Sequence, residues 1–275
     1  MSIQRSNTEQ GGRVRALSLP GNLMCVEGTF AHQRTTYVAE YILSHCGGKW
    51  EITHTLRVRQ RGRRDRVQGA VRDALQARMM DHISSSDCPS DGFDLTTHLY
   101  NIRQEIHRDK DVLSDLDADA TWATSVPGAT TVRRFRTGTI NVLRCARVGD
   151  RTVYAHGEYL IRQEALHIAC TVRTDTQDVS VDTLHRGVTY AVRGLSSSSS
   201  GRAVPQALRE EIVSVVRECA LTSLDAPTVA SLRDKIDTMK GDVAQKQADE
   251  RWIRSLPRRM AKTPLDVQAL VSQPG

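Results

Sequence analysis

The stretch TYVAEYILSHCGGKWEITHTLRVRQ, residues 36–60, places two β-rich runs on either side of a glycine pair. The runs at 36–43 and 50–59 are rich in Val, Ile, Thr, Tyr and Trp, which favour a pleated strand. Gly47 and Gly48 provide the backbone freedom that a tight reversal needs. The sequence therefore predicts a β-hairpin, and this hairpin is the starting point for the fold class.

The second strand of the hairpin leads into a run of arginines. RVRQRGRRDR, residues 57–66, holds six arginines and a single aspartate. Asp65 is a candidate N-cap for a following helix, whose positive end disfavours cations unless an anion lies nearby. A bound phosphate would satisfy both the helix amides and the guanidinium groups. The predicted polyanion-binding residues, with a smaller cluster further along the chain, are Arg57, Arg59, Arg61, Arg63, Arg64, Arg66, Arg133, Arg134 and Arg136.

A helix is predicted after these arginines, because apolar residues from Val67 to Met79 recur at helical spacing. A similar pattern returns at 152–193 and aligns with 36–80 at a period near 117 residues. Duplication and convergence on one supersecondary unit both explain this match. In the second pattern the predicted strands are 152–161 and 166–173, and the predicted helical positions are Leu184, Val188, Ala191 and Val192.

The rest of the chain supplies further helices and a domain boundary. Apolar residues from Leu95 to Leu116 recur at helical spacing behind a capping Asp94, and β-like texture follows at 131–148. The sequence predicts an α+β fold, in which hairpin and helix units form a sheet packed by helices. The predicted domains are a flexible basic arm at 1–20, a β-rich core at 21–194, a Ser-rich linker at 195–204 and a helical C-terminal region with its tail at 205–275.

The C-terminal region contains a short heptad seam. Its apolar positions alternate by three and four residues, which suits helix pairing within the protein or between subunits. We assign the seam to homo-oligomerisation, through Val229, Leu232, Ile236, Met239 and Val243.

Composition narrows the class of partner. The 275 residues include 32 arginines and only six lysines, with a net charge of +6, so polyanionic partners are expected. Aromatic residues make up only 4%, which argues against a base-stacking surface. The six cysteines are widely spaced without a CxxC pair, and we expect free thiols in a reducing, intracellular compartment. The chain shows no secretory signal and no transmembrane segment, so a secreted or membrane-spanning protein is not expected.

The sequence carries no pattern that defines a reaction. The acidic run DLDADA lacks the glycine and glutamate of a calcium loop, and His156-Gly157-Glu158 lacks the second half of a zinc deaminase signature. Nucleotide-binding, zinc protease and serine hydrolase motifs are missing. We therefore expect no enzyme, no catalytic residue, no metal site and no cofactor.

Two parts of the chain resemble the matrix proteins of rhabdoviruses. EITHTLRVR followed by VQGAVRDALQARM is similar to their strand that passes through a basic turn into a helix. GEYLIRQEALHIACTVRTDTQDVSVDTL is similar to their later hairpin and helix. The resemblance covers 36–80 and 152–193. It implies a viral structural protein of the virion that self-associates, coats the inner face of an anionic membrane and binds RNA or ribonucleoprotein.

Two other function classes remain open. A nucleic-acid-binding viral non-structural protein, of the plant-virus movement type, also combines a β-rich core with C-terminal helices. Such a protein would bind single-stranded RNA without lipid. An interaction scaffold would instead recruit a partner through the helix at 226–256, and truncation at Gly201 would then leave the β-core intact.

Overall fold

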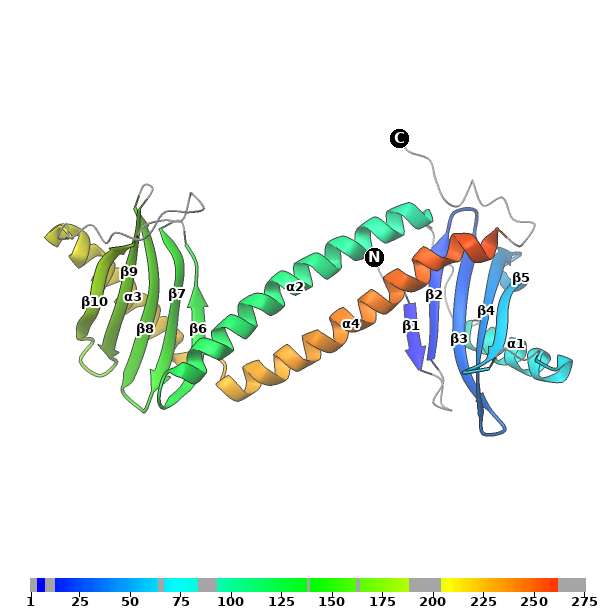
Figure 1. Ribbon diagram of the computed structural model, residues 1–275, viewed down its shortest axis with the longest axis horizontal. Helices are drawn as coiled ribbons and strands as arrows, with labels where there is room; N and C mark the ends of the chain where they lie inside the picture. Colours follow the sequence, from blue (N-terminus) through cyan, green and yellow to red (C-terminus); the bar gives the residue numbers. More distant parts are fainter. Residues whose placement is uncertain are drawn as a thin grey trace. The chain divides into compact units, whose positions relative to one another are not determined.

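The chain forms two compact units, each built on one five-stranded antiparallel sheet (Figure 1). Unit 1 comprises Met1–His107 with Ala244–Gly275, and unit 2 comprises Arg108–Val243. The sheets and helices confirm the predicted α+β class. The computed structural model describes residues 4–7, 13–63, 67–83, 93–137, 139–161, 164–187 and 204–261.

Each sheet is a meander in which every strand pairs with the next one along the chain. The strands of unit 1 are β1 (Gln4–Asn7), β2 (Arg13–Leu19), β3 (Leu23–His32), β4 (Thr35–Cys46) and β5 (Lys49–Gln60). The strands of unit 2 are β6 (Ala129–Phe135), β7 (Ile140–Val148), β8 (Thr152–Ile161), β9 (Glu164–Arg173) and β10 (Val179–Gly187). The helices are α1 (Gly69–Ile83), α2 (Leu95–Ser125), α3 (Gln206–Thr222) and α4 (Val229–Met260), with a 3-10 turn at Ser223–Asp225.

The predicted hairpin is the β4–β5 pair. Gly47 and Gly48 form its turn with φ values of 58° and 79°, which side chains with a Cβ rarely adopt. The predicted cap of α2 is also present, because the Thr97 backbone N–H donates to Asp94 Oδ1 at 2.7 Å. The hairpin and the start of α2 were thus correctly predicted from local sequence.

The sheet of unit 1 is covered by helices on both faces. On one face, α1 buries Leu75 and Met79 in the same cluster as Tyr41. On the other face, the start of α2 and the end of α4 enter one cluster with alternate strand residues such as Ile42. Both faces of the strands are therefore apolar, which explains the near-continuous burial from Ala39 to Leu43.

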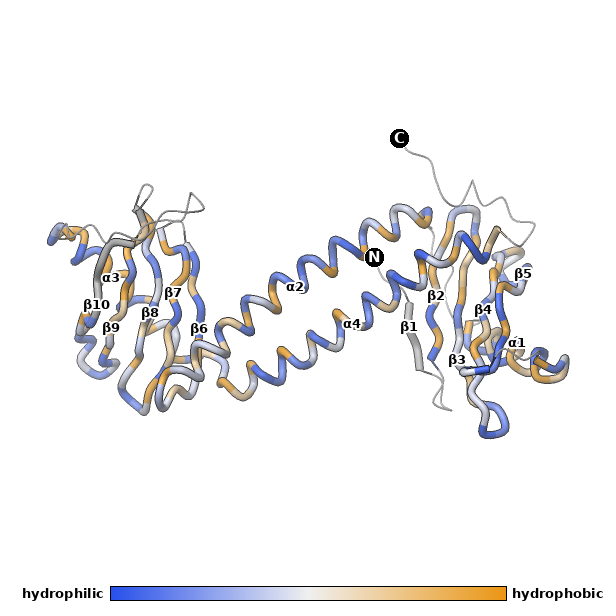
Figure 2. The backbone as a smooth tube through the Cα atoms, in the orientation of Figure 1, coloured by the Kyte–Doolittle hydropathy of each residue, from blue (hydrophilic) through white to orange (hydrophobic). Residues whose placement is uncertain are grey.

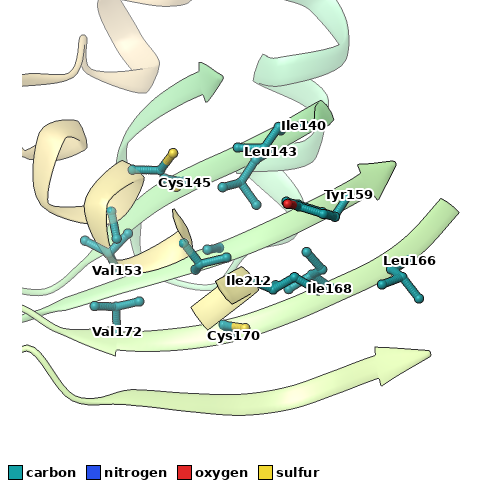
Figure 3. Packing of buried hydrophobic residues seen from close by; sticks show 14 residues of the cluster. Ile140, Leu143, Cys145, Val153, Tyr159, Leu166, Ile168, Cys170, Val172 and Ile212 are labelled. Carbon is teal, nitrogen blue, oxygen red and sulfur yellow. The ribbon is translucent and has the colours of Figure 1, made fainter. Parts of the chain in front are cut away.

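The sheet of unit 2 is covered differently on its two faces. Figure 3 shows the first face, where strand residues pack around Ile212 of α3. On the second face, the end of α2 and the start of α4 form a smaller cluster with Val132 of β6. Within the described residues, β8 and β9 contribute nothing to that smaller cluster. Part of this face therefore lies open.

The two units share one order of elements: a five-strand meander, a helix on one sheet face, and then a long helix. Their central strands also share one register. In unit 1, Arg15 pairs with Glu27, and Glu27 pairs with Glu40. In unit 2, Arg144 pairs in the same way with His156, and His156 pairs with Ala169. A shift of 129 residues relates each member of the first set to its counterpart in the second. Unit 2 thus repeats unit 1, and β4 corresponds to β9.

This repeat corrects the predicted alignment. The period near 117 residues matched β4 with β8, one strand too early. The predicted helix around Leu184 is wrong, because Val179–Gly187 forms strand β10, paired with β9. Val188, Ala191 and Val192 lie outside the described residues. The helix that corresponds to α1 is α3, further along the chain.

The predicted domains also need correction. The basic arm was expected to be flexible, yet β2 pairs with β3 and buries Val14, Leu17 and Leu19. The β-rich core is two sheets rather than one, and the C-terminal helices are no separate region, because they complete the cores of both units. Most of the Ser-rich linker lies outside the described residues.

Candidate functional site

The arginine run divides into an exposed part and a buried part. Arg59, Arg61 and Arg63 are exposed where β5 ends. The Arg61 backbone N–H donates to Thr36 O at 2.8 Å, which holds this end against the β3–β4 turn. That turn carries the exposed Arg34 and is hydrophilic in Figure 2. We call Arg34, Arg59, Arg61 and Arg63 the basic end.

The basic end is unneutralised within the part of the chain that the structure describes. None of its four guanidinium groups makes a hydrogen bond or an ion pair to a described residue. Arg64, Asp65 and Arg66 lie outside the described residues, so the predicted cap and two of the predicted arginines have no assigned position. The four arginines form a surface of one sign, which attracts polyanions.

Arg57, by contrast, belongs to an ion network beneath α4. Its Nη2 lies 2.5 Å from Glu27 Oε2, and its Nε lies 3.6 Å from Glu40 Oε2. Arg15 bridges Glu27 at 2.5 Å and Asp249 of α4 at 2.9 Å. Arg57 is therefore engaged within unit 1, and its assignment to a polyanion site is wrong because two carboxylates already neutralise it.

Glu40 is the centre of this network and is completely buried. Its Oε1 accepts hydrogen bonds from Trp252 Nε1 at 2.7 Å and from Arg259 Nη2 at 2.8 Å. Burial raises the pKa of Glu40 above its usual value, although the charge of Arg259 opposes this shift. The network therefore holds the end of α4 to the sheet and offers no open face to a ligand.

In the second predicted arginine cluster, two of the three guanidinium groups are paired with aspartates. Arg134 forms ion pairs with Asp115 and with Asp119, the latter at 2.7 Å. Arg136 Nη1 lies 3.1 Å from Asp115 Oδ2. Burial acts to raise the pKa of Asp115, but its hydrogen bond to Arg134 and the neighbouring positive charges lower the pKa below its usual value. Arg133 donates to Thr222 O at 2.9 Å.

These contacts correct the polyanion prediction for Arg134 and Arg136. For Arg133, which has no carboxylate partner among the described residues, it stays a prediction. Arg134 and Arg136 tie α2 to the β6 strand and its end, and Arg133 ties β6 to the end of α3. Part of the predicted oligomer seam is likewise occupied inside unit 2, because Leu232 and Ile236 pack with Ala120 and Ala123 of α2, with Val229 beside them. Val243 is buried and Met239 is half-buried, and neither belongs to this cluster. Of the two pairings that the heptad pattern allowed, the structure shows the one within the chain.

A pocket of about 550 Å³ opens on the second face of the unit 2 sheet. Ser125, Val126 and Pro127 line it where α2 ends. Trp122 of α2 forms a wall, and the strands supply the floor, which comprises Val148, Thr152, Tyr154, His156 and Thr171. Its volume lies within the range of small-ligand sites, about 300–1,000 Å³.

Two of the few aromatic side chains of this protein, Trp122 and Tyr154, lie together with a histidine ring at the pocket. The rings of Trp122 and Tyr154 are nearly parallel, at 14°, with centroids 6.2 Å apart. Trp122 and His156 are 6.3 Å apart at 23°. Although His156 is exposed at the surface, partial desolvation, followed by the charge of Arg144, lowers its pKa below the usual value, so its neutral form is favoured.

Sequence reasoning did not find this site. Tyr154 and His156 alternate on β8, so they share a sheet face, and that was the only local signal. Trp122 comes from a helix that the sequence pattern followed only as far as Leu116. Aromatic residues are few in this chain, but composition alone does not predict that two of them lie together beside a histidine.

Other site classes find little support in the described residues. No group of three or more His, Cys, Asp or Glu side chains there is arranged to hold a metal ion. The five described cysteines are free thiols, and four of them are buried. None of the helices that the structure describes combines the length and apolar character needed to cross a membrane.

The fold and site define an α+β protein of two repeated units with one basic end and one aromatic pocket. No family model matches the chain, and neither a curated protein nor a solved structure matches it. The likeness to rhabdovirus matrix proteins therefore stays a prediction from the sequence.

Proposed function

We propose that this protein binds RNA through the basic end and acts structurally rather than catalytically. The observation that carries the proposal is the set of four exposed arginines without a described acidic partner, gathered where β5 and the β3–β4 turn meet. A guanidinium group matches a phosphate with two parallel hydrogen bonds. The connection then leads into α1, which has no acidic residue in its first turn and so adds no repulsion to an anion.

An anionic membrane face is the competing partner. Proteins that lie on membranes usually insert apolar side chains beside their cations. The large exposed apolar side chains among the described residues are Phe93, Tyr100, Val112 and Leu224. None of them belongs to β3, β4, β5 or α1, so the surroundings of the basic end favour RNA.

Self-association is part of the same structural role and remains a prediction. Two residues of the seam that motivated it, Leu232 and Ile236, are buried against α2 in unit 2. A coat or matrix role would need another contact between copies, and sedimentation velocity across a concentration series measures whether one exists.

The test compares two variants that lose the same charge. One replaces Arg34, Arg59, Arg61 and Arg63 by Gln, and the control replaces four exposed cations elsewhere, Arg108, Lys110, Arg209 and Arg258. Anisotropy with a fluorescent single-stranded RNA gives affinity across a salt series. Each arginine that no longer neutralises a phosphate lowers the slope of log K against log salt by about 0.7. We expect a lower slope for the basic-end variant than for its control.

Equal slopes for the two variants would contradict the proposal, because net charge alone would then account for binding. A parallel co-sedimentation with phosphatidylserine vesicles and with neutral vesicles tests the membrane. Binding to anionic vesicles without binding to RNA would replace the proposed function by a membrane-coat role.

A further inference from the structure

The repeat shows that the pocket of unit 2 occupies a position that unit 1 fills with its own chain. The 129-residue shift relates the pocket residues Val148, Tyr154 and Thr171 to Leu19, Cys25 and Ile42. In unit 1 these three residues are at most 2% exposed and share a cluster with the last turns of α4. The same position is therefore closed in one unit and open in the other.

The helices explain the difference. Trp252 of α4 and Trp122 of α2 each follow a buried aspartate by three residues, and these aspartates bind the equivalent arginines Arg15 and Arg144. After its tryptophan, α4 continues to Met260 and covers the sheet. The α2 helix instead ends at Ser125, three residues past Trp122.

The residues on the pocket floor also differ in chemistry from their equivalents in unit 1. Cys25 and Ile42 are replaced by Tyr154 and Thr171, and Leu23 by Thr152, so three hydroxyl groups stand where unit 1 has none. The Tyr154 and Thr152 hydroxyls make no hydrogen bond to any described residue. An apolar occupant would leave them unpaired, at a cost. A planar ring with polar edges would use both the aromatic wall and the hydroxyls.

The rim of the pocket carries two arginines. Arg173 pairs with Thr152 across β8 and β9, which places both on the sheet face that lines the pocket. Arg173 and Arg151 share one carboxylate, Asp175, at 3.1 Å and 3.6 Å. The charge of Asp178 also acts on Arg173, so the rim carries charges of both signs. On the inner side, Asp182 accepts a hydrogen bond from the Thr171 hydroxyl at 3.0 Å.

We propose that this pocket holds a base of single-stranded RNA. The base would lie against the Trp122, Tyr154 and His156 rings, with its polar edge toward Thr152 and its phosphate toward Arg173. Every base has a face that can stack, so this contact needs no sequence preference. The inference rests on the proposed RNA binding and adds a second contact to it, one that engages bases rather than phosphates.

The test uses two strands of equal length, one with bases and one with abasic spacers at every position. Both carry the same phosphates, so a stacking pocket makes the wild type prefer the strand with bases. We expect this preference to fall about 5- to 150-fold in Tyr154→Ala, which corresponds to the loss of one stacked base. Tyr100→Ala is the matched control, because Tyr100 is 62% exposed on α2 and does not line the pocket. His156→Ala serves as a second variant, since His156 is exposed and its removal spares the core.

The outcomes separate the two proposals. A preference that disappears in Tyr154→Ala and His156→Ala, but persists in Tyr100→Ala and in the basic-end variant, supports the pocket. If the wild type binds both strands alike, the pocket proposal is overturned and RNA binding by the basic end still stands. An unchanged preference in the two pocket variants leads to the same conclusion. A wild type that binds neither strand overturns the proposed function itself.

Discussion

Glu40 shows how a single residue fixes the end of a helix. Its carboxylate is completely buried, and it receives hydrogen bonds from Trp252 and Arg259, more than two hundred residues away in the chain. Burying a charge is costly, and the pair offsets that cost only when its geometry is good. The main energetic effect of removing Glu40 would come from Arg259, which would remain half-buried without its carboxylate partner.

We therefore expect Glu40→Ala to lower the free energy of unfolding by about 3–5 kcal/mol, the usual cost of removing one partner of a buried ion pair. Urea unfolding followed by circular dichroism measures this change. Glu51→Ala, an exposed residue on the neighbouring strand β5, should change stability by no more than about 0.5 kcal/mol. Similar losses in both variants would show that the network contributes nothing specific.

Individual arginines also show the limit of sequence reasoning. The sequence assigns Arg57 and Arg134 to ligand binding because their neighbours in the chain are cationic. Their partners are Glu27 and Asp119, which lie on other elements and are brought close only by folding. Local sequence predicts that a cation is present, but whether it is already neutralised depends on tertiary contacts.

At the level of elements, two equivalent glycines lie where neighbouring atoms leave little room for a Cβ. Gly28 and Gly157 share one place in the repeat. A Cβ at Gly157 would overlap the backbone carbonyl of Val142, at the irregular pairing of β7 with β8. A Cβ at Gly28 would instead overlap the side chains of Phe30 and Met79, which have rotamer freedom. Backbone atoms cannot move aside as side chains can. Gly157 should therefore tolerate substitution by alanine less well than Gly28.

Gly157→Ala should therefore destabilise unit 2 by at least about 1–3 kcal/mol, the usual range for an overpacked site. Gly241→Ala is the opposite case, since Gly241 lies in α4 with no atom near its missing Cβ. Alanine there should stabilise the protein by about 0.5–1 kcal/mol. Thermal unfolding of the two variants should move the midpoint in opposite directions, and a shared direction would contradict this account.

The elements differ in how well sequence predicts them. The β4–β5 hairpin and the start of α2 have local signals, a glycine pair and a capping aspartate, and both were predicted. Strand β2 was missed because its buried residues alternate with arginine and serine inside a polar segment. Strand β10 was predicted as a helix because short apolar runs fit either period. The pocket depends on where α2 ends, and no local signal fixes that.

At the scale of the whole molecule, the C-terminal helices complete both cores. Ile212 and Val216 of α3 fill one face of the unit 2 sheet, and Trp252 and Leu256 of α4 fill one face of the unit 1 sheet. The interaction-scaffold alternative predicts that truncation at Gly201 leaves the β-core intact. The packing contradicts that expectation, because each sheet would lose the cover of one face.

A chain that ends at Gly201 should therefore fail to unfold cooperatively and should bind the dye ANS, which reports exposed apolar surface. A chain that ends at Ala261 keeps every described contact and should unfold like the full chain. Cooperative unfolding of the shorter chain would show that the sheets are stable without α3 and α4.

The closure of unit 1 by α4 has a consequence for synthesis. The strands of this sheet leave the ribosome first, but the turns that cover Leu17 and Ile42 are among the last described residues of the chain. Chains are made at about 5–20 residues per second, and apolar surface exposed in that interval promotes aggregation. Unit 1 is therefore completed after unit 2, and one face of its sheet stays uncovered while the residues between them are made.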